Sequence, residues 1–158
     1  MPTNFLINYY IYTHMEFLII PHDVAKKIVR EHIGKLNVIS VEKDEPVNST
    51  LCKNHLHLLI DDIQDCHIEK FNRELKEKGM LYPEKEDIIK ALDFDKKCNH
   101  KIHIIHCHAG ISRSPAIGYA ILRGRGKSKN YAMGEIMKIA PWADPNKRIV
   151  RLTDEIFG

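Results

Sequence analysis

The sequence lacks the features that mark membrane-spanning, secreted and disulfide-bonded proteins. No apolar run approaches the roughly 20 residues that a helix needs to cross a bilayer. Residues 4–12 are apolar and aromatic, but they have no basic start and no small-residue cleavage site, so a signal peptide is not expected. The four cysteines, at positions 52, 66, 98 and 107, form no Cys-x-x-Cys pair and no disulfide framework. We therefore predict a reduced, cytoplasmic protein with no membrane partner.

A large excess of charge of either sign is also missing. The net charge of +3 suits an anionic substrate, but it is too small to indicate a nucleic-acid partner. The hydrophobic content of 44% is high enough for a packed core, which argues against a disordered chain. A length of 158 residues fits one domain. We expect a monomer with a single domain over residues 1–158.

The most informative feature that is present is the run from His106 to Ser114, which reads HCHAGISRS. An apolar run precedes it and a helix-like run follows it, so the pattern predicts a strand, a loop and a helix. The start of such a helix and a curled loop both offer N–H groups to an anion. The helix end and Arg113 would also favour the thiolate of Cys107, the reactive form of cysteine. The loop is therefore a candidate site for a nucleophilic sulfur beside a tetrahedral oxyanion.

The order His-Cys-x5-Arg-Ser resembles the signature loop of the cysteine-based protein phosphatases, and it is most similar to that of the dual-specificity branch. The resemblance implies that Cys107 attacks phosphorus and forms a phosphocysteine, while Arg113 binds the phosphate. It also implies that Ser114 donates a hydrogen bond to the sulfur, and that His106 orients the loop and helps to keep the thiolate ionised. The phosphate-binding residues would be those of the loop: His108, Ala109, Gly110, Ile111, Ser112 and Arg113. The alternative is that Cys107 is an unreactive core thiol.

Three carboxylates that follow another apolar run are candidates for the general acid that such chemistry needs. Residues 56–60 read as a strand, and Asp61, Asp62 and Asp65 come after it. Paired aspartates at a strand end resemble the acid-bearing loop of the same phosphatases, notably the phosphatases of regenerating liver. By that likeness Asp62 is the first choice, Asp61 the second and Asp65 the third. The alternative is that these residues form a turn or cap a helix.

Together these residues predict a phosphomonoester hydrolase that acts on a phosphoprotein or phosphopeptide without a cofactor or a metal ion, because Arg113 and the loop amides would stabilise the charge. Two alternatives keep the loop and change its use. The substrate could be a phosphoinositide or a 5′-triphosphorylated RNA, although phosphoinositide enzymes usually carry lysines in this loop and this loop has none. The loop could also bind phosphate without turning it over.

A zinc site is the rival interpretation, since histidine and cysteine are common zinc ligands. Four histidines surround Cys107 in the sequence: His100, His103, His106 and His108. Side chains alternate along a strand, so His103 and His106 would point to opposite faces and would not share an ion. We therefore predict no metal site.

Strands and helices alternate along the chain. Apolar runs predict strands at residues 5–12, 37–42, 56–60 and 101–106, with 16–20 as either a strand or the start of a loop. Helical spacing predicts helices at residues 23–33, 66–78, 84–97 and 114–123, one from the cap Ser128 to Ala140, and a last one from 144–146 to 157. This order predicts an α/β fold with a mostly parallel sheet of about four to five strands flanked by helices.

Three segments also resemble a group of bacterial tyrosine-phosphatase-like proteins. They are Asp-Asp-Ile at 61–63, the loop at 109–114 and Pro-x-Ala-x-Pro-Asn at 141–146, and the resemblance spans residues 36–158. For the Pro-Asn pair we predict only that it helps the last helix to pack below the loop. Ligands of parallel sheets bind beyond the carboxyl ends of the strands, so the aspartate and cysteine loops should converge there.

Overall fold

Four short strands form one parallel sheet in the computed structural model, which describes residues 15–44 and 46–158. The strands are β1 (Leu18–Pro21), β2 (Asn37–Val41), β3 (Asn54–Leu58) and β4 (Ile104–Cys107), in the spatial order β1-β4-β2-β3. Each neighbouring pair is parallel. The predicted α/β class with a parallel sheet is thus confirmed. The strand predicted for residues 5–12 lies outside the described residues.

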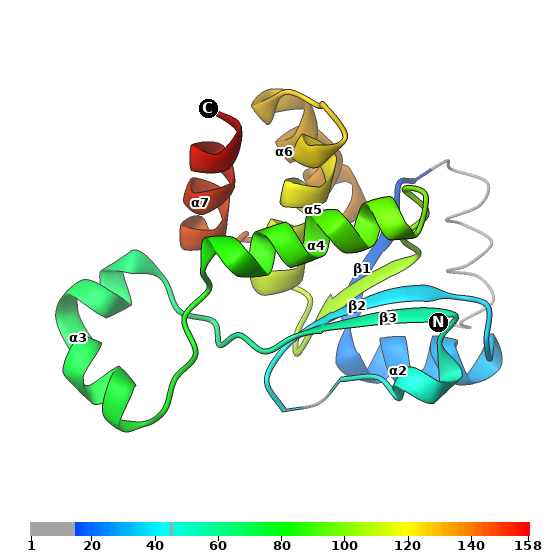
Figure 1. Ribbon diagram of the computed structural model, residues 1–158, viewed down its shortest axis with the longest axis horizontal. Coiled ribbons are helices and arrows are strands. Elements are labelled where there is room, and N and C mark those ends of the chain that lie inside the picture. Colours follow the sequence, from blue (N-terminus) through cyan, green and yellow to red (C-terminus); the bar gives the residue numbers. More distant parts are fainter. Residues whose placement is uncertain (1–14, 45) are drawn as a thin grey trace.

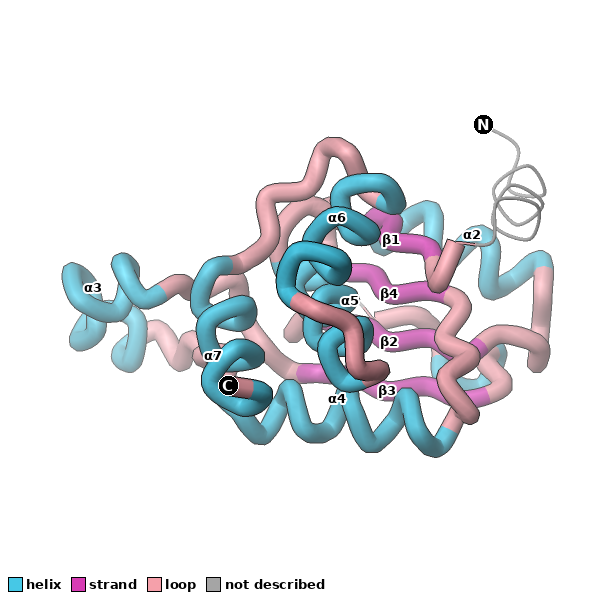
Figure 2. Tube along the Cα trace, turned by 90° about the horizontal axis from the view of Figure 1, so that it is seen from above, coloured by secondary structure: helices cyan, strands magenta, loops and turns pink. Residues whose placement is uncertain are grey.

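Helices cover both faces of the sheet, because a parallel sheet must be buried on both sides. One face carries α2 (His22–Glu31), and the other carries α4 (Lys85–Lys97), α5 (Arg113–Gly124), α6 (Lys129–Ile139) and α7 (Lys147–Phe157), as Figure 1 and Figure 2 show. The central strand β4 alternates between the two cores. Ile105 packs in the larger core with α4 to α7, whereas Ile104 packs in the smaller core with α2.

The carboxyl ends of the four strands meet at one edge of the sheet, and the strand boundaries there differ from the predicted ones. β3 ends two residues early, since Leu58 is the last residue that pairs with β2. The carbonyl of Leu58 accepts a hydrogen bond from the N–H of Ile60 at 3.1 Å, so the chain turns at this point. Ile60 therefore belongs to the aspartate loop and not to the strand.

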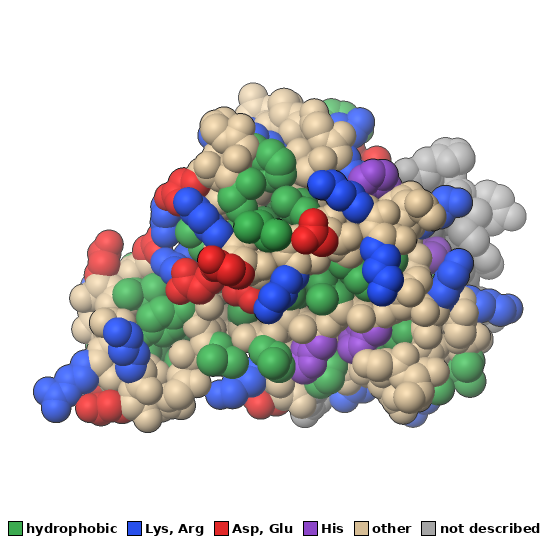
Figure 3. Space-filling model, viewed as in Figure 1, with side chains coloured by type: hydrophobic (Ala, Val, Ile, Leu, Met, Phe, Trp, Pro, Cys, Tyr) green, Lys and Arg blue, Asp and Glu red, His purple; other side chains and the backbone are tan. Residues whose placement is uncertain are grey.

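The helix α3 (Asp65–Glu77) projects from the rest of the molecule (Figure 1). None of its residues is buried, and Phe71 is 51% exposed at a kink with non-helical φ and ψ of −132° and 22°. Hydrophobic side chains gather on this arm of the surface (Figure 3). The apolar spacing correctly predicted the helix, but it gave no indication that the helix would lie outside the core.

Two helices begin where polar caps predict them. Ser128 Oγ accepts a hydrogen bond from the N–H of Tyr131 at 3.2 Å and starts α6, and Asn146 Oδ1 accepts one from Ile149 at 3.0 Å and starts α7. Throughout residues 15–44 and 46–158, every helix is too short or too polar to cross a membrane.

Candidate active site

The predicted nucleophile lies at the bottom of the loop between β4 and α5. Cys107 is the last residue of β4 and is 2% exposed. Its Sγ lies 3.2 Å from Oγ of Ser114 and 3.3 Å from the backbone nitrogen of Gly110. Both groups can donate a hydrogen bond to a thiolate, the form of cysteine that attacks. The structure thus places two donors on the sulfur.

Gly110 allows the loop to curl against the neighbouring strand. Its φ is +73°, and a Cβ built on it would lie 3.0 Å from the backbone carbon of Ile20 and 3.1 Å from the nitrogen of Pro21. The indole Nε1 of Trp142 donates a hydrogen bond to the Gly110 carbonyl at 3.1 Å. Only glycine fits this conformation and this space without strain, so the shape of the loop depends on it.

Arg113 joins the cysteine loop to the aspartate loop. It is the first residue of α5, so its backbone N–H belongs to the helix end that favours anions. Its Nη1 donates a hydrogen bond to the carbonyl of Ile60 at 3.0 Å. A guanidinium has five N–H donors, so this bond leaves others for a phosphate in the loop.

Of the three candidate acids, Asp62 contacts the cysteine loop. Its Oδ1 accepts a hydrogen bond from Ser112 Oγ at 2.7 Å and another from Asn146 Nδ2 at 2.9 Å. Asp61 instead accepts a hydrogen bond from the N–H of Leu81 at 2.7 Å, which fits a structural role in the turn. The geometry therefore places Asp62 against the cysteine loop and Asp61 against the backbone of Leu81.

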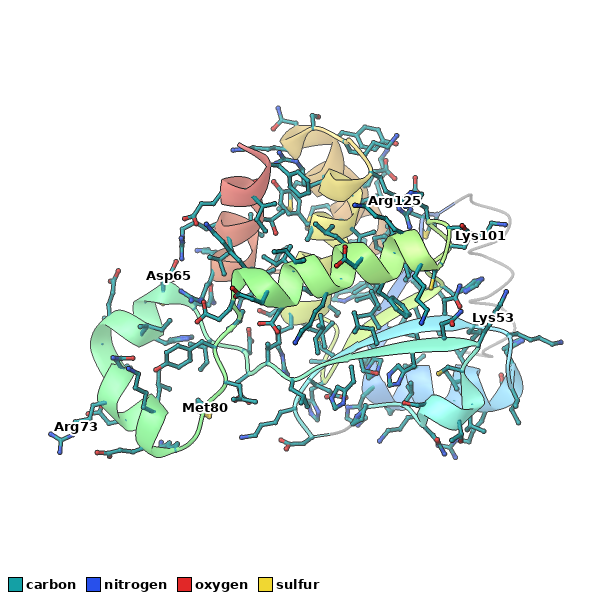
Figure 4. The ribbon with its side chains drawn as sticks, in the orientation of Figure 1. Lys53, Asp65, Arg73, Met80, Lys101 and Arg125 are labelled. Carbon is teal, nitrogen blue, oxygen red and sulfur yellow. The ribbon has the colours of Figure 1, made fainter. Side chains whose placement is uncertain are left out.

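Asp65 is held away from the loop by two arginines of α7. Its Oδ1 lies 2.7 Å from Nη1 of Arg148, and its Oδ2 lies 2.7 Å from Nε of Arg151. Figure 4 labels Asp65 at the start of α3, beside the base of α7. Hydrogen bonds from Arg151 and Arg148 lower the pKa of the Asp65 carboxyl, which makes it a poor proton donor near neutral pH.

Asn146 links the two loops to the last helix, and the sequence analysis missed its contacts. The side chain is fully buried. Besides Asp62, its Nδ2 donates to the carbonyl of Ile63 at 3.1 Å, and its backbone N–H donates to the carbonyl of Ser112 at 3.0 Å. The Pro-Asn pair near the carboxyl terminus was the available signal. The pair does start the last helix, but Asn146 also holds the Asp62 side chain against the loop.

A directed chain of hydrogen bonds supports the loop from below. The carbonyl of Cys107 can only accept, so His106 must donate from Nδ1, at 3.2 Å. His106 Nε2 must then accept from the hydroxyl of Ser40, at 2.6 Å, and His55 Nε2 must donate to that same hydroxyl oxygen, at 2.8 Å. His55 Nδ1 in turn accepts from the hydroxyl of Ser49. The donor and acceptor roles of these side chains are all consistent with one another when both imidazoles are neutral.

Burial keeps these two imidazoles neutral. Desolvation lowers the pKa of His106 to about 4 and the pKa of His55 to about 4. A neutral His106 gives the sulfur of Cys107 no positive charge. Its hydrogen bond to the carbonyl of Cys107 is compatible with the predicted role in orienting the loop.

Cys52 and Cys98 have different surroundings. Burial raises the pKa of the Cys52 thiol to about 11 and raises that of Cys98 as well. All four cysteines are free thiols in the structure. Cys107 therefore stands apart in having hydroxyl and backbone donors on its sulfur.

Several solved structures with the same fold are of dual-specificity phosphatases or a phosphatase domain. The chain is similar to DUSP15 (20% identity, 88% of this chain and 81% of that chain, TM-score 0.63) and to the Yvh1 phosphatase domain from Chaetomium thermophilum (20% identity, 89% of each chain, TM-score 0.62). It is also similar to human DUSP28 (16% identity, 90% of this chain and 91% of that chain, TM-score 0.59). No family model and no curated protein matches the sequence. The chain thus has the fold of the dual-specificity and tyrosine phosphatases, which confirms the fold that its loop implied.

Proposed function

We propose that the protein hydrolyses phosphate monoesters on protein side chains through a phosphocysteine intermediate. The observation that carries this proposal is the convergence of Cys107 and Asp62 on one loop. Two donors contact the sulfur of Cys107, and Ser112 of the same loop holds the carboxyl of Asp62 at 2.7 Å. A nucleophile and a proton donor on one anion-binding loop are the two parts that phosphoryl transfer to cysteine requires.

The reaction proceeds in two displacements at phosphorus. In the first, the Cys107 thiolate forms the S–P bond while the P–O bond to the leaving alcohol or phenol breaks, and protonated Asp62 gives its proton to the leaving oxygen. In the second, water forms a new O–P bond as the S–P bond breaks, and the Asp62 carboxylate takes the proton of that water. Ser114 donates a hydrogen bond to the departing sulfur. The net result consumes one water and releases the alcohol and inorganic phosphate.

Positive and dipolar groups of the chain itself stabilise the transition state. Arg113 and the N–H groups at the start of α5 face the loop, so the charge on the phosphoryl oxygens meets donors that are already in place. The loop carries no lysine beside the cysteine, which favours a single phosphate on a protein over a phosphoinositide. We therefore expect phosphopeptides to be better substrates than phosphoinositides.

Hydrolysis of p-nitrophenyl phosphate in the presence of a chelator tests the proposal. We expect turnover by the wild-type protein and none by Cys107→Ser. Asp62→Asn should lower kcat for a phosphopeptide by about 10²–10⁴-fold, the usual contribution of general acid–base catalysis. Asp61→Asn is the matched control, since Asp61 bonds to the Leu81 backbone, and it should retain most of the activity. Full activity of Cys107→Ser would refute the proposal.

A further inference from the structure

We propose that His22, Glu42 and His108 form a binding site for a divalent transition-metal ion, with Zn²⁺ as the favoured ion. One ligand atom from each of these side chains lies within 4.8 Å of the other two. The site does not rest on the phosphatase function, because none of the three side chains contacts the sulfur of Cys107 among the contacts of that sulfur described above.

The register of the sheet brings the three residues together. Each is the first residue after its strand: His22 follows β1, Glu42 follows β2 and His108 follows β4. β4 lies between β1 and β2. Pro21 pairs with Cys107, so the next residues, His22 and His108, lie side by side at the strand ends. Ser40 pairs with His106, so Glu42 and His108, two positions further on, also lie opposite each other in the register of β2 and β4.

The site lies on the sheet face opposite the nucleophile. Cys107 packs in the core with α5, on the face that α4 to α7 cover. Residues an odd number of positions from Cys107 in the register of the sheet pack in the core with α2; Ile104 lies three positions before it on β4, and Ile20 of β1 pairs with His106, one position before it. Side chains alternate along a strand, so the histidines and the glutamate belong to the α2 side. An ion there would leave the sulfur free.

Two imidazoles and a carboxylate are a common protein ligand set for Zn²⁺, with a water in the fourth position. Ligands at about 2.0–2.1 Å from a tetrahedral ion lie ~3.3 Å apart, so the three side chains must approach one another by up to about 1.5 Å. His108 is exposed and His22 is partly exposed, so both imidazoles have room to turn. Glu42 is 3% exposed and would be the fixed member of the set.

A hydrogen bond already sets the protonation of one ligand. His22 Nδ1 lies 3.1 Å from the carbonyl oxygen of His108, which can only accept, so the proton is on Nδ1. The lone pair is then on Nε2, which is the ring nitrogen that can bind a cation in this tautomer. Zinc-binding histidines typically donate their second N–H to a carbonyl or carboxylate in this way. The rings of His22 and His108 also lie against each other, with centroids 4.5 Å apart.

The buried carboxylate of Glu42 favours a cation at this place. Taking a carboxylate out of water is costly unless positive charge accompanies it. A divalent ion held by Glu42 would supply that positive charge.

Binding would connect the phosphate loop to two neighbouring strands. His108 is a residue of that loop, while the other two ligands follow β1 and β2. An ion shared by all three would restrict the loop from the side opposite Cys107. From the sequence we predicted no metal site, and these three ligands are far apart in the chain.

Metal titration of the full chain tests the proposal. The Cys107→Ser background removes the thiolate as a competing ligand. We expect one equivalent of Zn²⁺ by isothermal titration calorimetry, a higher Tm with Zn²⁺, and visible absorption bands of tetrahedral Co²⁺. His22→Gln, Glu42→Gln and His108→Gln should each weaken binding by more than about tenfold. His100→Gln is the matched control, because His100 also lies beside a carboxylate, 2.7 Å from Asp95, and it should bind normally.

Three results would overturn the proposal: no binding in the Cys107→Ser background, binding that His22→Gln and His108→Gln leave unchanged, or binding that is lost in the His100 control. Glu42→Gln can fail to fold because the residue is buried, so the two histidine variants carry the decision. Activity in the presence of a chelator is a separate readout. Its loss bears on the proposed function, whereas the Co²⁺ spectrum bears on the metal site alone.

Discussion

Replacing Gly110 with alanine should lower the free energy of unfolding through two separate costs. The first is conformational, because φ is +73° and a non-glycine residue there costs about 1–2 kcal/mol in free energy of unfolding. The second is steric, because the new Cβ would lie 3.0 Å from the backbone of Ile20. Forcing a group into packed surroundings costs about 1–3 kcal/mol. We therefore expect a total loss of about 2–5 kcal/mol.

Gly126→Ala is the control that isolates the first part. Gly126 has φ of +85°, but nothing lies within 4 Å of a Cβ built on it. It should lose only the conformational cost of about 1–2 kcal/mol. Urea-induced unfolding of both variants gives the two losses directly.

Activity supplies the second readout for Gly110→Ala. The backbone of Ile20 and Pro21 is held in β1 by its pairing with β4, so the loop must move instead. Moving the loop displaces the Gly110 N–H from the sulfur of Cys107, and we expect kcat for p-nitrophenyl phosphate to fall ~100-fold. Equal stability losses in the Gly110 and Gly126 variants, or full activity of Gly110→Ala, would refute this reasoning.

Two further predictions concern Asn146 and His55. Asn146→Ala should lose about 1–2 kcal/mol of stability because it removes the helix cap. Asn146→Ser should keep the cap, but both variants should lower kcat because neither supplies the amide N–H to Asp62. Equal kcat in the wild type and in Asn146→Ser would count against a role of Asn146 in holding Asp62. The pKa of His55 is about 4 in the folded protein against an ordinary 6.5. Between these two pH values the unfolded chain binds a proton that the folded protein does not bind, so the free energy of unfolding falls as the pH drops from 6.5 to about 4. The loss attributable to His55 should be roughly 2 kcal/mol between pH 7 and 5. His106 and His57 face His55 and remain, so His55→Gln should reduce the pH dependence of urea unfolding without removing it.

The loop at Cys107 could be predicted from the sequence because its parts are contiguous. A strand, a tight turn and a helix follow one another there, and local rules are enough to place the sulfur near a helix end. The aspartate loop could be predicted for the same reason. The choice among its three carboxylates rests on contacts that local rules do not contain. Asp65 is held by arginines 83 or more positions away, and Asp62 by Asn146, 84 positions away.

The support beneath the loop could not be predicted, because it depends on strand order and register. Ser40 and His106 are 66 positions apart, and they meet only because β2 and β4 are neighbours with those two residues paired. The proposed metal ligands share this origin. The position of α3 outside the core could not be predicted either. Its apolar spacing is that of a core-facing helix, yet none of its residues is buried.

The measurement that tests the central claim most directly is the capture of phosphate on Cys107. Asp62→Asn should accumulate the intermediate with p-nitrophenyl phosphate, because that leaving group needs little proton donation whereas hydrolysis of the intermediate needs a base. After rapid acid quench and proteolysis, we expect mass spectrometry to find a phosphate adduct on the Cys107 peptide and none in Cys107→Ser. Turnover without an adduct on Cys107, or an adduct on another residue, would contradict the account.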